Sequence, residues 1–234
     1  MEKNNIERTL FWFKDGEIAL QALVEYYFSL ATLLNRLLNE KYQGKKIKFI
    51  NLYFSTEETY RIYPQIPKNS VHYYRGYLNY YGVFDYKFFL KLSEAERDNI
   101  LWQKSFGFLQ ECAKSMKNNE LSEASEYAYA KGMHTNFDRD YKMVESDVTI
   151  FGIPIKASVW VNFRKDGMYS KLTLEKEDRV VFEKDIDKTQ NAIEFFLEMY
   201  KNVKVENNKI VIQGRKDVDY LPLTIPIARD IVDA

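Results

Sequence analysis

Residues 155–176 read IKASVWVNFRKDGMYSKLTLEK. From Ile155 to Phe163 every second residue is apolar, and this alternation predicts a strand with one buried face. The dipeptide Asp166-Gly167 is a strong signal for a tight hairpin turn, and a second strand-like run follows it. The stretch therefore predicts two neighbouring antiparallel strands.

Similar runs lie on both sides of this hairpin, at residues 141–151 and 179–186. Short connections between consecutive runs indicate an antiparallel meander. Apolar residues then recur at helical spacing over 189–201, which predicts a helix. Residues 203–214 predict a closing β-hairpin that turns at Asn207-Asn208.

The N-terminal part carries helix signals instead. Apolar residues recur at spacings of three and four over 16–42, and this predicts one long helix with Asp15 as its N-cap. Ser93 and Glu96 form a capping box that opens a predicted helix over 94–117, and a shorter helix is expected over 121–131. Aromatic and β-branched residues favour a strand over 45–55.

These patterns predict an α+β fold. We expect a helical, aromatic-rich region at residues 1–135 and an antiparallel sheet region at 136–234, the latter a β-meander followed by a helix and a β-hairpin. No linker rich in Gly, Ser or Pro separates the two regions, so two domains and one continuous domain both stay open.

Tyrosine is concentrated at residues 71–89, VHYYRGYLNYYGVFDYKFF, which hold six of the 18 tyrosines. We expect a short helix or turn up to about residue 81, followed by an extended or helical segment. Adjacent positions point in different directions, so some of these rings must be exposed. A partner-binding face is the favoured interpretation, and a layered core or a small-ligand wall are the alternatives. The candidate partner-binding residues are Tyr73, Tyr74, Arg75, Tyr77, Tyr80 and Tyr81.

Composition excludes several classes. Lys plus Arg equals Asp plus Glu at 34 each, which argues against a nucleic-acid binder that neutralises many phosphates. We interpret the lysine cluster at 41–48 as a solvated helix end and strand start. The apolar region 18–38 contains Glu25 and Arg36, so no membrane span is expected. One cysteine, Cys112, and a charged N-terminus predict a cytoplasmic protein without disulfides.

Motifs for chemistry are sparse. The closest two glycines are six positions apart, which excludes the dinucleotide fingerprint, the phosphate loop and the serine-hydrolase elbow. Neither of the two histidines belongs to a zinc-protease motif. His134 lies near Asp138 and Asp140, and these three could form an acid–base or cation-dependent site. We predict no cofactor and no resident metal.

The sequence thus favours a cytosolic, non-enzymatic protein-binding protein, of the kind that an inhibitor or a bacterial immunity protein represents, whose surface occludes a toxin or another protein. The alternative is a metal-dependent or acid–base hydrolase with its site at His134, Asp138 and Asp140. A ligand-binding sensor is a more distant third.

Overall fold

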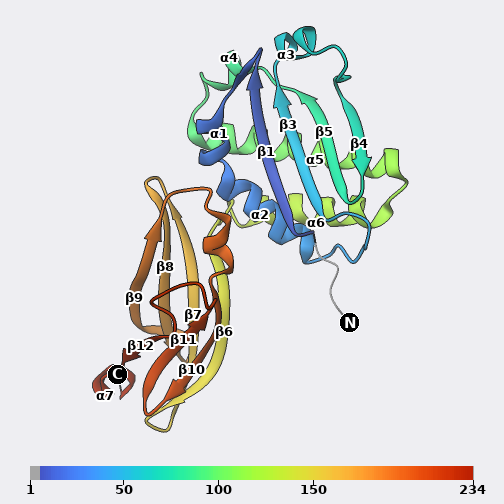
Figure 1. The fold of residues 1–234 in the computed structure, drawn as a ribbon. Helices are drawn as coiled ribbons and strands as arrows, with labels where there is room; N and C mark the ends of the chain where they lie inside the picture. Colours follow the sequence, from blue (N-terminus) through green and yellow to red (C-terminus); the bar gives the residue numbers. More distant parts are fainter. Residues whose placement is uncertain (1–5, 234) are drawn as a thin grey trace. The chain divides into compact units, whose positions relative to one another are not determined.

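The computed structural model describes residues 6–233. The chain divides into two compact units, Met1–Arg139 and Asp140–Ala234, which are drawn in Figure 1. The predicted division into regions 1–135 and 136–234, as two domains or as one continuous domain, stays a prediction. Each unit is described by itself.

The first unit is built on a five-stranded sheet with strand order β2-β1-β3-β5-β4. The three central strands are parallel, and the two edge strands are antiparallel to their neighbours. Its elements in chain order are β1 (Arg8–Asp15), β2 (Ile18–Ala19), α1 (Gln21–Tyr26), α2 (Phe28–Asn39), β3 (Phe49–Ser55), α3 (Glu57–Ile62), β4 (Ser70–Tyr74), β5 (Tyr77–Val83), α4 (Tyr86–Phe89), α5 (Glu94–Met116) and α6 (Asn119–His134).

Helices α2, α5 and α6 all lie on one face of this sheet (Figure 1). We call this the inner face. Its strand residues, among them Phe11, Leu52, Phe54 and Leu78, belong to one buried core with Trp102 and other residues of the three helices. Helix α5 begins directly after Ser93, and the predicted capping box of Ser93 and Glu96 is present at this end.

The predicted helical N-terminal region is wrong, since a five-stranded sheet forms its centre. Strand β1 was not predicted at all. Central parallel strands carry apolar residues on both faces and lack clear alternation, as Leu10 to Phe13 illustrate. The long helix expected over 16–42 is interrupted at Tyr27, whose backbone leaves the helical region, and only α1 and α2 are helical.

The tyrosine-rich stretch 71–89 also differs from its predicted helix or turn. Residues 71–83 form the hairpin of β4 and β5, in which Tyr74 pairs with Tyr77, and α4 then follows within the segment expected to be extended or helical. The two turn residues, Arg75 and Gly76, have φ angles of 47° and 90°. Two central residues with positive φ are the mark of a type I′ turn, whose twist matches that of the strands. The hairpin distributes its rings over both sheet faces.

The second unit contains a four-stranded sheet, ordered β6-β7-β8-β9, and a three-stranded sheet, ordered β10-β11-β12. All described pairings in both sheets are antiparallel. Its elements are β6 (Tyr141–Ile150), β7 (Ile153–Arg164), β8 (Gly167–Lys176), β9 (Arg179–Thr189), the 3-10 helix η1 (Glu194–Glu198), β10 (Tyr200–Glu206), β11 (Lys209–Gly214), β12 (Leu223–Pro226) and α7 (Arg229–Asp233).

The antiparallel strands predicted for this unit are present, and the closing hairpin turns at Asn207 and Asn208, both with positive φ. The helix expected over 189–201 is wrong. Ala192 has a φ of 66°, which an α-helix does not allow. Only the short 3-10 helix η1 lies between β9 and β10.

No helix within residues 6–233 is both long enough and apolar enough to cross a membrane.

Candidate functional site

The face of the five-stranded sheet opposite the helices is open in the first unit: over residues 6–139, no helix lies across it (Figure 1). We call it the outer face. Register aligns its side chains in three rows that run across β1, β3, β5 and β4. The rows are Arg8, Phe49, Tyr77 and Tyr74; Leu10, Asn51, Asn79 and His72; and Trp12, Tyr53, Tyr81 and Ser70.

Two of these rows are aromatic ladders. The rings of Phe49 and Tyr77 stack with centroids 4.6 Å apart, and those of Tyr53 and Tyr81 stack at 4.8 Å. Trp12 continues the second ladder with its ring centroid 6.4 Å from that of Tyr53. Neighbouring strands are about 4.8 Å apart, so residues that pair directly place their rings at stacking distance. The result is two ladders of near-parallel rings on the outer face.

Apart from Leu10, the middle row is polar, and hydrogen bonds link it internally and to Trp12 of the next row. Trp12 Nε1 donates to Asn51 Oδ1 over 3.0 Å, and Asn51 Nδ2 donates to Asn79 Oδ1 over 2.8 Å. His72 pairs with Asn79 and is exposed. Hydrogen bonds that hold side chains in one orientation reduce the entropy lost when a partner binds. The outer face is therefore preorganised.

Cations lie around the margins of the outer face. The guanidinium of Arg8 lies 5.5 Å from the ring centroid of Phe49, and that of Arg75 lies 5.1 Å from the centroid of Tyr74. Lys14, at the end of β1, places its ammonium 3.8 Å from the ring centroid of Tyr63. Arginine and lysine over aromatic rings combine charge with apolar contact area, which suits recognition of an acidic surface.

Burial raises the pKa of both Tyr53 and Tyr81, and the nearby Tyr81 raises that of Tyr53 further. Tyrosine ordinarily titrates near pH 10, so both hydroxyls stay protonated at neutral pH. They can each donate a hydrogen bond from the outer face. Protonated hydroxyl groups of this kind can bind a partner by hydrogen bonding.

The predicted partner-binding residues divide between the two faces. Tyr74 and Tyr77 lie on the outer face and are 56% and 44% exposed. Tyr81 joins them in the ladder. Tyr80 points to the inner face, is 5% exposed and stacks on Phe108 at 4.4 Å, so it forms part of the core.

Two further predicted residues do not lie on the outer face. Tyr73 pairs with Leu78, on the helix side of the edge strand, and its hydroxyl donates to the Lys46 carbonyl over 2.7 Å. Arg75 is in the hairpin turn. Sequence reasoning missed the members from β1 and β3, such as Trp12 and Asn51. Residues 49, 51 and 53 do alternate, but their partners on β5 lie far along the chain.

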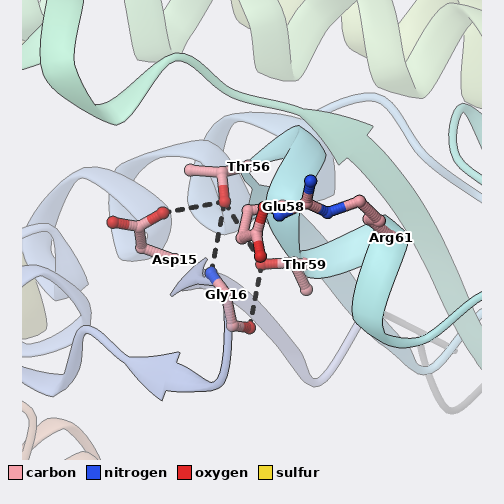
Figure 2. Close-up of polar contacts among 6 residues, drawn as sticks. All are labelled: Asp15, Gly16, Thr56, Glu58, Thr59 and Arg61. Carbon is pink, nitrogen blue, oxygen red and sulfur yellow. Dashed lines mark hydrogen bonds and ion pairs between the residues drawn. The ribbon is translucent and has the colours of Figure 1, made fainter.

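A polar cluster closes one end of the sheet, where β1 and β3 finish. Figure 2 shows its members: Asp15, Gly16, Thr56, Glu58, Thr59 and Arg61. Thr56 Oγ1 donates to Asp15 Oδ1 over 2.9 Å and accepts from the Gly16 amide over 3.3 Å. Thr59 Oγ1 donates to the Gly16 carbonyl over 3.1 Å. The carboxyl ends of parallel strands often bind ligands. Here the hydroxyl groups of Thr56 and Thr59 instead connect the turn after β1 to α3 through hydrogen bonds.

The residues of the alternative hydrolase site are spread over two units. His134 ends α6 and is exposed. Asp138 belongs to the first unit, and its carbonyl accepts from Arg36. Asp140 belongs to the second, where its Oδ2 accepts from Asn162 Nδ2 over 2.7 Å. Over residues 6–233, no group of three His, Cys, Asp or Glu side chains is arranged to hold a metal ion. This site stays a prediction.

No protein-family model, no curated protein and no solved structure matches the chain.

Proposed function

We propose that this chain is a non-enzymatic binding protein whose outer face docks on, and occludes, the surface of another folded protein. The observation that carries the proposal is the pair of stacked aromatic ladders on an open sheet face. Tyrosine, tryptophan and arginine are the residues that contribute most at protein interfaces. Here they are fixed on strands rather than on loops.

Shape favours a protein over a small ligand. Small-molecule sites are concave, and two pockets of the first unit, of about 480 and 510 Å³, are lined by residues outside the three rows. Seven paired residues on each of the central strands give the four-stranded face a size of about 19 by 23 Å from standard spacings. That is a face of about 440 Å², in which two aromatic rows flank a mainly polar one.

The charged residues around the outer face further define the kind of partner surface. The aromatic centre and the marginal cations Arg8, Lys14 and Arg75 complement a flat surface that is apolar in the middle and acidic around its edge. The zero net charge of the chain offers no general attraction to nucleic acid. Inhibitors and immunity proteins act in this way, because occlusion needs a surface and no reaction chemistry.

The proposed location is the cytoplasm. The single cysteine, Cys112, is fully buried in α5. Burial raises the pKa of its thiol to about 12, so the reactive thiolate is scarce at neutral pH. A free, unreactive thiol suits a reducing compartment.

The test is photocrosslinking in the native host, with a photoreactive phenylalanine at position 77 or at Glu123, an exposed residue of α6. We expect an adduct with a second protein from position 77 and none from position 123. The purified partner should then bind the wild-type chain. Its affinity for Tyr74→Ala/Tyr77→Ala/Tyr81→Ala should fall by roughly 100-fold or more, since each interface hot spot is worth about 2 kcal/mol or more.

Phe88→Ala/Leu90→Ala is the matched control. These residues are 51% and 47% exposed but lie at α4, outside the outer face. Their loss should leave the affinity unchanged. Equal binding by the folded tyrosine variant would contradict the proposal, and so would an adduct from position 77 that contains only a second copy of this chain.

A further inference from the structure

The five-stranded sheet ends on one side in strand β4 (Figure 1). Within residues 6–233, β4 is hydrogen-bonded to β5 alone. Tyr74 and Tyr77 flank the two-residue turn, so these two residues exchange backbone hydrogen bonds. Hydrogen-bonded pairs alternate with non-hydrogen-bonded pairs along an antiparallel ladder. The backbone N–H and C=O groups of Val71 and Tyr73 therefore point away from β5, where a further strand can pair with them.

Strand β4, residues 70–74, lacks the features that usually protect the edge of a sheet from pairing. Proteins protect such edges with very short strands, charged side chains, proline or β-bulges. Of the other edge strands, β2 has two residues and β12 contains Pro226. Strands β6, β9 and β10 combine charged residues with an irregular register. The sequence SVHYY of β4 holds no Asp, Glu, Lys, Arg or Pro, and its register with β5 is continuous.

The order of side chains along β4 is complementary to a second copy of the same strand. In an antiparallel pair with a two-fold axis at His72, Tyr74 lies opposite Ser70 of the second copy, and Tyr73 lies opposite Val71. Each large ring then lies beside a small side chain, on both faces of the sheet. Side chains directly opposite one another are the pairs that stabilise a sheet.

Charge also allows β4 to pair with its own copy. A charged residue near the two-fold axis would lie close to an identical charge, and like charges directly opposite one another are destabilising. None of the residues of β4 is acidic, lysine or arginine. Lys68, which precedes the strand, is ion-paired with Glu57 over 3.0 Å. Arg75, which follows it, lies over the ring of Tyr74.

The same pairing continues the rows of the outer face. His72 ends the middle row and would lie beside His72 of the second copy, so that one polar row joins the other. The aromatic row that ends at Tyr74 would continue through Ser70 of the second copy to its Tyr81. A two-fold axis perpendicular to the sheet keeps both outer faces on the same side. The two outer faces would therefore form one continuous open surface.

We propose that β4 is a self-association edge, through which two copies of this chain pair antiparallel into one sheet with the two-fold axis at His72. The backbone groups of Val71 and Tyr73 supply the hydrogen bonds, and the contact is isologous. The edge is only five residues long. The interface is therefore small, and the dimer is weak and depends on concentration. The outer face stays open in the dimer, so self-association does not depend on the proposed function.

The first measurement is the oligomeric state of the purified full chain. Sedimentation velocity from about 10 to about 500 µM should show a reversible monomer–dimer equilibrium with a Kd in the micromolar range. A monomer over the whole range would overturn the proposal. Assembly beyond a dimer would also overturn it, because an isologous pair uses both copies of the edge. Partner binding at the outer face is measured separately, and a monomer that binds the partner would contradict self-association alone.

Disulfide trapping locates the two-fold axis. His72 and its copy form a non-hydrogen-bonded pair, whose Cα atoms lie about 4.5 Å apart, within the range that a disulfide spans. His72→Cys should therefore give a disulfide-linked dimer on mild oxidation with copper phenanthroline. Tyr74→Cys is the matched control, because position 74 is also exposed but lies about 14 Å from its copy by standard strand spacings. Cys112 is buried in both variants. Equal trapping at the two positions, or trapping at position 74 alone, would overturn the proposal.

A charge placed at the axis tests the same contact without a covalent bond. His72→Lys brings two ammonium groups together and should weaken the dimer at least about tenfold, and added salt should restore part of the affinity. His72→Asn adds no charge and should dimerise as the wild type does. Val180→Lys adds the same charge at an exposed position of the edge strand β9 and should also dimerise normally. Unchanged dimerisation of folded His72→Lys, or an equal loss in Val180→Lys, would overturn the proposal.

Discussion

The inner and outer faces of the five-stranded sheet both carry aromatic residues, but the rings are arranged differently on each face. Inner rings such as Phe54 pack at varied angles, 18° to Phe13, 67° to Phe11 and 80° to Phe84. The described outer pairs are all within 25° of parallel. On the inner face, helices pack against the strands, so each ring contacts neighbours from several directions. On the open outer face, the spacing of the strands alone orients the rings. The first arrangement stabilises the fold, and the second lines an open face with near-parallel rings.

The sharpest test of this difference uses two neighbours on β3. Phe54 is fully buried on the inner face, and Tyr53 is half-buried on the outer face. Phe54→Ala leaves a cavity in a close-packed core and should lower the free energy of unfolding by about 3–5 kcal/mol. Tyr53→Ala should cost less, about 1–3 kcal/mol, the value of its two aromatic pairs with Trp12 and Tyr81. Urea denaturation of both variants measures the two losses.

Equal losses would show that the outer face is as tightly packed as the core. The outer face would then not be a free binding surface, and its aromatic ladders would serve to stabilise the fold.

Adding a methyl group to the inner face should have the next largest effect. A Cβ atom at Gly82 would lie 2.1 Å from the Phe108 ring, so Gly82→Ala should lower the free energy of unfolding by about 1–3 kcal/mol through overpacking. Gly107→Ala is the control, because a Cβ atom there meets nothing within 4 Å. On a helix that substitution should be stabilising by about 0.5–1 kcal/mol. Thermal denaturation measures both, and a stabilising Gly82→Ala would mean that the inner face has unused space.

The smallest expected effect is a pH dependence in the helix layer behind the inner face. Asp98 of α5 is ion-paired with Arg139, but burial raises its pKa and outweighs the opposing effect of Arg139. A raised pKa favours the protonated form in the folded state. The associated stability is present below the unfolded pKa of about 3.9 and is lost as pH rises through the folded pKa.

The free energy of unfolding of wild type, minus that of Asp98→Asn, should therefore decrease as pH rises from about 4. Chemical denaturation across the acidic range measures it. A difference that increases with pH would mean that the ion pair dominates over burial.

Local signals in the sequence predicted local structure. The Ser93 capping box, the alternation over 155–163 and the Asn207-Asn208 turn each depend on residues a few positions apart, and each is present. The parallel pairing of β1 with β3 was not predictable in this way, because Arg8 meets Phe49. A continuous apolar run without a neighbouring partner cannot be distinguished from a helix segment by periodicity.

The candidate site depends still more on distant pairing. That some tyrosines of 71–89 must be exposed follows from the directions of adjacent side chains. Which ones are exposed depends on where the helices pack, and this separates Tyr80 from Tyr81. Asn51 and Trp12 join the face only because β3 aligns with β1 and β5 in one register.

The parallel centre of the sheet also has a consequence for how the polypeptide is made. Strand β1 emerges from the ribosome with Leu10 and Trp12 on one side and Phe11 and Phe13 on the other, and none of these has a strand to pair with until β3 has been translated. Long-range pairing of this kind slows acquisition of the native state and leaves nascent chains prone to self-association. A pause in translation between β1 and β3 would prolong that vulnerable interval.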